Sequence, residues 1–190
     1  MGQNLSEKRP WNEYSHSQHL SSAEIAEQLI GNGFCPIPVK AKTKKPAFND
    51  WPTRAFQPSD FKNSCSVGLK TGNGLIGLDI DHYDHIVVQQ IRNEAERYFG
   101  VGLARIGQPP KILLLYRCDF ITKKQTLKLA PSGKAPERKS EALEILAKGQ
   151  QAVVSGIHPE TNAPYIWETV EPWDIAAGQL DRLPKIREYE

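Results

Sequence analysis

The stretch LIGLDID, residues 75–81, carries the pattern from which the fold and the chemistry of this chain can be predicted. In an extended strand, alternation sends Leu78 and Ile80 to one face and Asp79 and Asp81 to the other. The two carboxylates then lie about 6 to 7 Å apart, so they repel each other and favour a bound cation. Mg²⁺ or Mn²⁺ would suit them, because hard ions take carboxylate oxygens and leave room for phosphates. The alternative is a strand that simply emerges into solvent.

A third carboxylate lies inside another predicted strand, ALEILA, residues 142–147. A charge in the middle of a strand is costly unless it is paired or bound to metal. Glu144 would therefore complete a metal clamp with Asp79 and Asp81, and these three residues are the predicted catalytic and metal-binding set. The competing interpretation is a glutamate on the wet face of a half-exposed sheet.

Two cations, Arg105 and Lys111, flank the turn residues GQPP directly before the apolar run 112–116. A guanidinium and an ammonium at a sheet end could hold a triphosphate, or they could only decorate a hairpin. His158 follows the predicted strand 151–155 and precedes Pro159, where an imidazole could donate to phosphate or cap a loop. Arg105, Lys111 and His158 are therefore candidates for binding the phosphates of a nucleotide.

The elements around these residues predict an α+β fold. Ser21 and Glu24 form a capping box for a helix that ends at Gly31, and the prolines at 36 and 38 confine the strand 34–39 to an edge. The sequence TGNG, residues 71–74, predicts a hairpin between strands 66–70 and 75–80. The order of elements suits a sheet covered by helices on one side. The remaining predicted elements are a helix over 86–99, a central strand over 112–116, and strands over 142–147, 151–155 and 164–168.

Two basic segments predict contacts with a nucleic-acid backbone, although each could also be a solvated loop. The second, residues 119–140, is a long connection, which is unusual inside a compact domain unless it has a function. The predicted DNA-binding residues are Lys40, Lys42, Lys44 and Lys45 in the first segment and Lys123 and Lys124 in the second.

Bulk properties set the frame for these predictions. The chain of 190 residues is long enough for one core, so we predict a flexible tail over 1–20 and one catalytic domain over 21–190. A net charge of +2 is too small to indicate a nucleic-acid binder by itself. The three cysteines are widely spaced, which argues against a zinc site and fits a reducing cytoplasm. No apolar run is long enough to cross a bilayer, so no membrane association is expected.

Taken in order, these pieces resemble the archaeo-eukaryotic primase superfamily. They are most similar to the primase-polymerase (Prim-Pol) domain at the N-terminus of bifunctional replication proteins of phages and plasmids, over residues 24–184. The resemblance implies an N-terminal α/β unit packed on an RNA-recognition-like (RRM-like) sheet module, with the active site between them. The motifs that carry the resemblance are GF at 33–34, PIPV at 36–39, KP at 45–46, VGLKTG at 67–72, LDID at 78–81, LEIL at 143–146 and GIHP at 156–159.

The resemblance also implies roles for individual residues. Asp79 and Asp81 match the first metal-binding motif and Glu144 matches the acidic residue of the third. The second motif usually contains a histidine, and here GQPPK at 107–111 replaces it, so Arg105 and Lys111 inherit the phosphate-binding role.

The implied function is template-dependent nucleotidyl transfer by two-metal-ion catalysis, as a DNA primase, a DNA polymerase or both. Its implied partners are nucleoside triphosphates, a DNA template and primer, and a helicase domain or protein. The alternative is a catalytically degenerate module that binds nucleotide or DNA in replication or defence.

Overall fold

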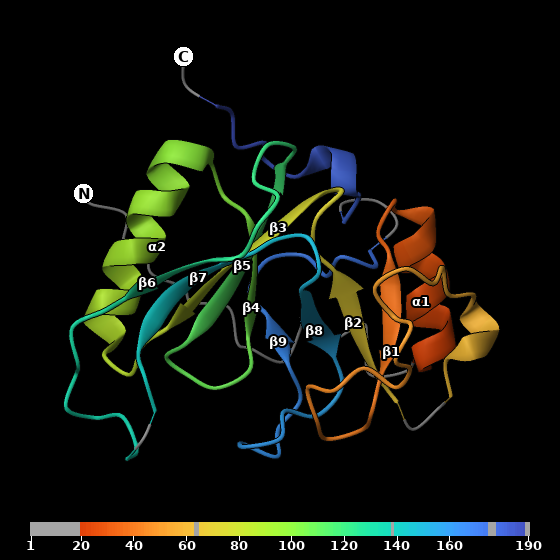
Figure 1. Ribbon diagram of the computed structural model, residues 1–190, viewed down its shortest axis with the longest axis horizontal. Coiled ribbons are helices and arrows are strands. Elements are labelled where there is room, and N and C mark those ends of the chain that lie inside the picture. Colours follow the sequence, from red (N-terminus) through yellow and green to blue (C-terminus); the bar gives the residue numbers. More distant parts are fainter. Residues whose placement is uncertain (1–19, 63–64, 138, 175–177, 189–190) are drawn as a thin grey trace, which may run out of the picture.

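The fold contains two antiparallel sheets, each of which has its own helix (Figure 1). The computed structural model describes residues 20–62, 65–137, 139–174 and 178–188. The predicted tail over 1–20 therefore lies almost entirely outside the described residues, and so does Arg138 of the second basic segment. The α+β class predicted from the sequence is confirmed.

The larger sheet has six strands in the order β6-β7-β3-β5-β4-β9. Its two central strands, β3 and β5, are the most deeply buried, as expected for strands with neighbours on both sides. Helix α2 (His85–Phe99) covers one face of this sheet. The strands are β3 (Gly74–Asp81), β4 (Leu103–Ile106), β5 (Ile112–Cys118), β6 (Gln125–Lys128), β7 (Ala142–Leu146) and β9 (Ile166–Trp167).

The smaller sheet has three strands in the order β1-β2-β8, and helix α1 (Ser22–Gly31) packs beside it. The predicted capping box of Ser21 and Glu24 is present at the start of α1. Strand β1 (Pro36–Val39) is an edge strand, as its two prolines predict. The other strands are β2 (Ser66–Lys70) and β8 (Gln151–Ser155), and two short 3₁₀ helices, η3 (Pro58–Asp60) and η4 (Leu180–Arg182), complete the elements.

The predicted hairpin between residues 66–70 and 75–80 is wrong, because β2 and β3 belong to different sheets. The TGNG turn is present, and Gly72 has a φ of +91° that favours glycine. However, β1 and β8 occupy both edges of β2, and β5 and β7 occupy both edges of β3. The turn instead carries the chain from one sheet to the other, with the Thr71 hydroxyl donating to the Ala147 carbonyl at 2.6 Å.

Other predicted elements also need correction. Strands β4 and β6 were not predicted, because β4 is short and β6 is exposed along its whole length. The strand predicted over 164–168 shrinks to two residues in β9. The helices do not share one side of a single sheet, since α1 and α2 lie at opposite ends of the molecule (Figure 1).

Two apolar cores follow from the alternation along the large sheet. One face, with Ile76 and Ile80 of β3, packs under α2. The opposite face, with Leu75 of β3 and Leu113 of β5, packs toward the small sheet and α1. Asp79 and Asp81 share this second face, so they lie on the side of the large sheet that meets the small one. Within the described residues, no helix is long and apolar enough to span a membrane.

Candidate active site

A single cross-strand row brings the predicted residues together. Asp79 on β3 pairs in register with Glu144 on β7 on one side, and with Leu113 on β5 on the other. Leu113 in turn pairs with Arg105 on β4. Residues that are directly opposite in an antiparallel pair point to the same face, with Cβ atoms roughly 4.5–5.5 Å apart. Glu144 therefore lies beside Asp79, and Arg105 lies two strands away on the same face.

The pKa of Asp79 is shifted by its surroundings in this row. Burial raises the pKa of Asp79, the charges of Arg105 and Lys44 lower it, and the nearby carboxylates of Asp81 and Glu144 raise it again. The net effect is a raised pKa. A carboxyl in this state gains most from an additional positive charge, because a cation would offset both the burial and the repulsion.

Arg105 connects the two halves of the molecule. Its Nη1 donates to the carbonyl of Val153 on β8, in the small sheet, at 2.8 Å. Its guanidinium carbon lies 4.5 Å from the centre of the Tyr165 ring. Burial lowers the pKa of Arg105 and the Asp79 carboxylate opposes this shift. The guanidinium is therefore fixed in place and still charged, as recognition of an anion requires.

The other two carboxylates form ion pairs with lysines. Lys111 Nζ lies 2.6 Å from Asp81 Oδ1, and Lys124 Nζ lies 2.9 Å from Glu144 Oε1. The Thr126 hydroxyl on β6 also donates to Glu144 Oε1 at 3.3 Å. Lysine is a flexible point charge, so each pair can separate when another cation approaches the carboxylate.

A small polar cavity of about 90 Å³ lies over Asp79 and Asp81. It is smaller than a typical small-molecule site of roughly 300–1,000 Å³, so a whole triphosphate needs more room than this cavity provides. Glu144 pairs in register with Asp79, but it is not among the described residues that line this cavity. The lining residues are Lys44, Asp79, Asp81, Arg105, Gly107, Gln108, Lys111, Ile112, Lys139, His158 and Glu160.

Two larger cavities, of about 480 and 420 Å³, lie away from this row. The first contains Arg117 and Asp119, from the end of β5 that is far from Asp79 in register, and the second lies around Leu103. Neither contains the acidic strand residues of the row. The small polar cavity over Asp79 and Asp81 is therefore the best candidate for chemistry, because it combines an acid of perturbed pKa with several cations.

His158 is buried at the wall of the small cavity. Only 3% of its surface is exposed, and its ring packs edge-on against Tyr165 with the ring centres 5.4 Å apart. Its Nδ1 accepts from the backbone N–H groups of Glu160 and Thr161, both at 3.3 Å. Burial and the charges of Lys44, Arg105 and Lys111 lower the pKa of His158, opposed by Glu160. The imidazole is thus neutral with its proton on Nε2, which can donate to a phosphate oxygen.

The predicted DNA-binding lysines separate into two groups. Lys44 lines the small cavity, and Lys124 reaches Glu144 from just before β6. The remaining four side chains are exposed on the same two segments: Lys40, Lys42, Lys45 and Lys123.

Several residues near the cavity were not among the predicted site residues. Lys139 and Glu160 form an ion pair at 2.7 Å and both line the cavity. Lys139 belongs to the second basic segment, so the sequence offered its positive charge as an indication of a binding role. The residues around Glu160 in the sequence offer no such indication. Tyr83 is a third case, because its ring contacts Lys111. Only the folding of distant segments brings these side chains to the site.

The residues present can be tested against the divalent metal expected from the resemblance. In the described part of the chain, no three histidine, cysteine, aspartate or glutamate side chains are close enough together to hold an ion as they stand. By chemistry, however, Asp79, Asp81 and Glu144 provide carboxylate oxygens on one sheet face, the ligand type that Mg²⁺ and Mn²⁺ prefer. The chemistry of the donor set fits such an ion, but the three carboxylates would have to turn toward one another, and Lys111 and Lys124 would have to release Asp81 and Glu144.

A half-buried acid beside cations at the junction of two sheets is the kind of site that handles phosphorylated ligands. Residues 26–185 match the family model described as "Prim-Pol: Bifunctional DNA primase/polymerase, N-terminal". The match covers most of the chain, and the chain therefore belongs to the Prim-Pol family. The family is one of primases and polymerases, enzymes of the nucleotidyltransferase type that generally depend on divalent metal. No curated protein matches the chain.

Proposed function

We propose that this protein catalyses template-dependent nucleotidyl transfer, as a DNA primase, a DNA polymerase or both. The observation that carries the proposal is the register that sets Glu144 beside Asp79, with Asp81 two residues further along the same face and Arg105 two strands away. Acids and cations on one face match the needs of a reaction in which a hydroxyl attacks a triphosphate.

In this proposal Asp79, Asp81 and Glu144 hold two Mg²⁺ or Mn²⁺ ions. When bound, the ions would stabilise the attacking oxygen and the leaving oxygen of the in-line displacement at the α-phosphorus. The protein's own residues do the rest of the binding. Arg105 is held rigidly by Val153 and Tyr165, so its charge faces the phosphates at little entropic cost.

Lys111 and His158 complete the proposed triphosphate site. Lys111 supplies a mobile positive charge, while the neutral His158 supplies one hydrogen bond from Nε2. Lys44 adds a further charge from the connection between β1 and β2. The exposed lysines around it would hold the backbone of the DNA template and primer.

The large sheet supports the RRM-like assignment of the second module. Strand β3, helix α2, strands β4 and β5 and then strand β7 follow the β-α-β-β order of a ferredoxin-like unit up to its last strand. The basic segment with β6 takes the position of the second helix.

We place the protein's activity in the cytoplasm, in replication of a phage, plasmid or other mobile element, together with a helicase domain or protein.

The test is primer extension by the double variant Asp79→Asn with Asp81→Asn. The two amides keep the shape of the strand but remove both charges, so incorporation should fall by at least about a hundredfold. The control is Asp50→Asn with Asp119→Asn, which changes two exposed aspartates outside the small cavity. Undiminished extension by the first variant would overturn the proposal, provided that both variants unfold like the unaltered protein.

A binding-only role is the second candidate, and the ion pairs at Asp81 and Glu144 favour it, because they occupy two of the three carboxylates. Labelled nucleotide offered on a primed template, first with Mg²⁺ and then with Mn²⁺, separates the two. Incorporation with either metal supports the enzyme, and nucleotide binding without incorporation under both conditions supports the binding module.

A further inference from the structure

Lys111 has a second anchor besides Asp81. Its ammonium lies over the Tyr83 ring, 3.9 Å from the ring centre, in a cation–π contact. Tyr83 lies just beyond the end of β3, and Lys111 directly precedes β5, so the contact joins two neighbouring strand ends. Lys111 is thus held between a carboxylate and an aromatic ring.

The two anchors respond differently when the proposed metal binds. A bound ion would take the Asp81 carboxylate, and the pair of Asp81 with Lys111 would then separate. The Tyr83 ring carries no net charge and is not a metal ligand, so its contact with the ammonium would persist. Without the ring, the four-carbon stem of the lysine would be free to move through many rotamers, and ordering it on a triphosphate would cost entropy.

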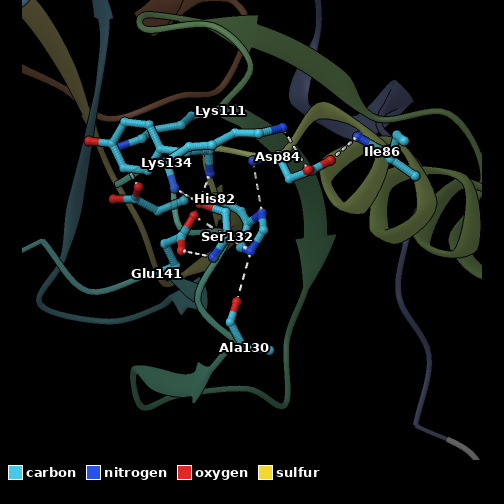
Figure 2. Close-up of polar contacts among 10 residues, drawn as sticks. His82, Asp84, Ile86, Lys111, Ala130, Ser132, Lys134 and Glu141 are labelled. Carbon is cyan, nitrogen blue, oxygen red and sulfur yellow. Dashed lines mark hydrogen bonds and ion pairs between the residues drawn. The ribbon is translucent and has the colours of Figure 1, made fainter. Parts of the chain in front are cut away.

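The backbone of Tyr83 is itself held by a buried clamp formed by His82 and Glu141, which are labelled in Figure 2. Glu141 Oε1 accepts from the backbone N–H of Tyr83 at 2.7 Å, and Glu141 Oε2 accepts from that of Ser132 at 2.6 Å. His82 Nδ1 accepts from the Asp84 N–H at 3.1 Å, so Nε2 carries the proton toward the Ala130 carbonyl at 3.0 Å.

The clamp is buried, since the exposed fractions of Glu141 and His82 are only 5% and 2%. Their polar groups therefore need partners inside the protein, and the hydrogen bonds given above supply them. Lys134 closes the clamp from outside, with its Nζ 2.8 Å from Asp84 Oδ2. The clamp therefore fixes the backbone on both sides of Tyr83 and ties the second basic segment to the end of β3.

We propose that Tyr83 is a positioning residue for the incoming nucleotide. Its ring holds the Lys111 ammonium at the cavity, so that the ammonium can contact the triphosphate when the Asp81 carboxylate binds a metal ion. The inference rests on the proposed function, and in particular on nucleotide binding by Lys111. The His82–Glu141 clamp holds the ring in place for this task.

The experiment measures the equilibrium dissociation constant of an α,β-methylene nucleoside triphosphate, without template, in a double-mutant cycle. Tyr83→Leu removes the ring and should weaken binding about threefold to thirtyfold, whereas Tyr83→Phe keeps it and should stay within about twofold. In a Lys111→Ala background, Tyr83→Leu should have no further effect. In primer extension, Tyr83→Leu should raise KM by the same factor and leave kcat within about twofold.

Tyr98→Leu is the matched control. Arg97 lies over the Tyr98 ring at 4.4 Å on the exposed side of α2, so this variant also removes a cation–π contact, but outside the small cavity. It should leave nucleotide affinity unchanged. Thermal unfolding of all variants checks that each one folds, and Tyr83→Met, which also removes the ring, carries the test if Tyr83→Leu does not fold.

The outcomes separate this inference from the proposed function. If Tyr83→Leu weakens binding equally with and without Lys111, the ring acts by another route and the inference is overturned. If Tyr83→Leu binds like the unaltered protein while Lys111→Ala does not, the inference again fails but the proposed function stands. If Lys111→Ala has no effect at all, the proposed phosphate role of Lys111 fails, and the inference fails with it.

Discussion

Gly107 shows how closely single residues are packed at the candidate site. A Cβ atom added there would lie 2.6 Å from Tyr165 Cε1 and 2.8 Å from His158 Cδ2. The Tyr165 ring packs against the Arg105 guanidinium and the His158 ring packs against Tyr165, so both rings have little freedom to move away. The absence of a side chain at Gly107 therefore allows the His158 and Tyr165 rings to occupy their positions beside the proposed triphosphate site.

We expect Gly107→Ala to displace His158 and Tyr165, with a loss of stability of about 1–3 kcal/mol and weaker nucleotide binding. Denaturant unfolding and equilibrium nucleotide binding measure the two effects. Gly31→Ala is the control, because a Cβ added at Gly31 meets nothing within 4 Å. Equal behaviour of the two alanine variants would show that the rings are not fixed by this contact.

At the scale of elements, the connection from β3 to α2 depends on one buried carboxylate. Burial by itself would raise the pKa of Glu141, but the N–H groups of Ser132 and Tyr83, together with His82, outweigh it and lower the pKa to about 2 from its ordinary value of 4.5. A depressed folded-state pKa means that the carboxylate stabilises the fold above the unfolded-state pKa. That contribution is lost as the pH falls from about 4.5 toward 2.

Glu141→Gln should accordingly lower the free energy of unfolding at neutral pH, and its difference from the unaltered protein should shrink as the pH falls below about 4.5. Denaturant unfolding at a series of pH values measures this. Glu137→Gln serves as the control and should show no such trend, because Glu137 is exposed near the end of the second basic segment, just before Glu141. A difference that stays constant down to pH 2 would contradict the role assigned to the Glu141 charge.

On the scale of the whole molecule, the site depends on the junction between the two sheets. Arg105 of the large sheet donates to Val153 of the small one, and Trp167 Nε1 donates to the neighbouring Val154 carbonyl at 3.1 Å. The small sheet also presents the first basic segment beside the cavity, since Lys44 lines it. Lysines from both halves thus surround one opening, which is the arrangement expected for a nucleic-acid backbone.

If exposed lysines of the first segment contact template phosphates, Lys42→Ala with Lys45→Ala should reduce the salt dependence of single-stranded DNA binding. Each lost phosphate contact removes roughly 0.7 from the slope of log affinity against log salt, so about 1.4 is expected for two. Fluorescence anisotropy over a range of salt concentrations measures the slope. Lys62→Ala with Lys148→Ala removes the same charge from exposed positions outside the segment and should leave the slope unchanged.

Local sequence determined the features that depend on a residue and its near neighbours. The alternation in LIGLDID placed Asp79 and Asp81 on one face, Ser21 and Glu24 capped α1, and two prolines kept β1 at an edge. These follow from backbone geometry and hydrogen bonding within a few residues, which the order of amino acids specifies directly.

Only the tertiary structure decided which strands meet. The same local reasoning joined β2 to β3 in a hairpin, although each has both edges filled by strands that are distant in sequence. It likewise gave no register for Glu144 against Asp79, and no reason for Tyr83 to lie under Lys111. Register and side-chain neighbours are set by the burial of whole sheet faces, a long-range packing energy that no short stretch of sequence contains.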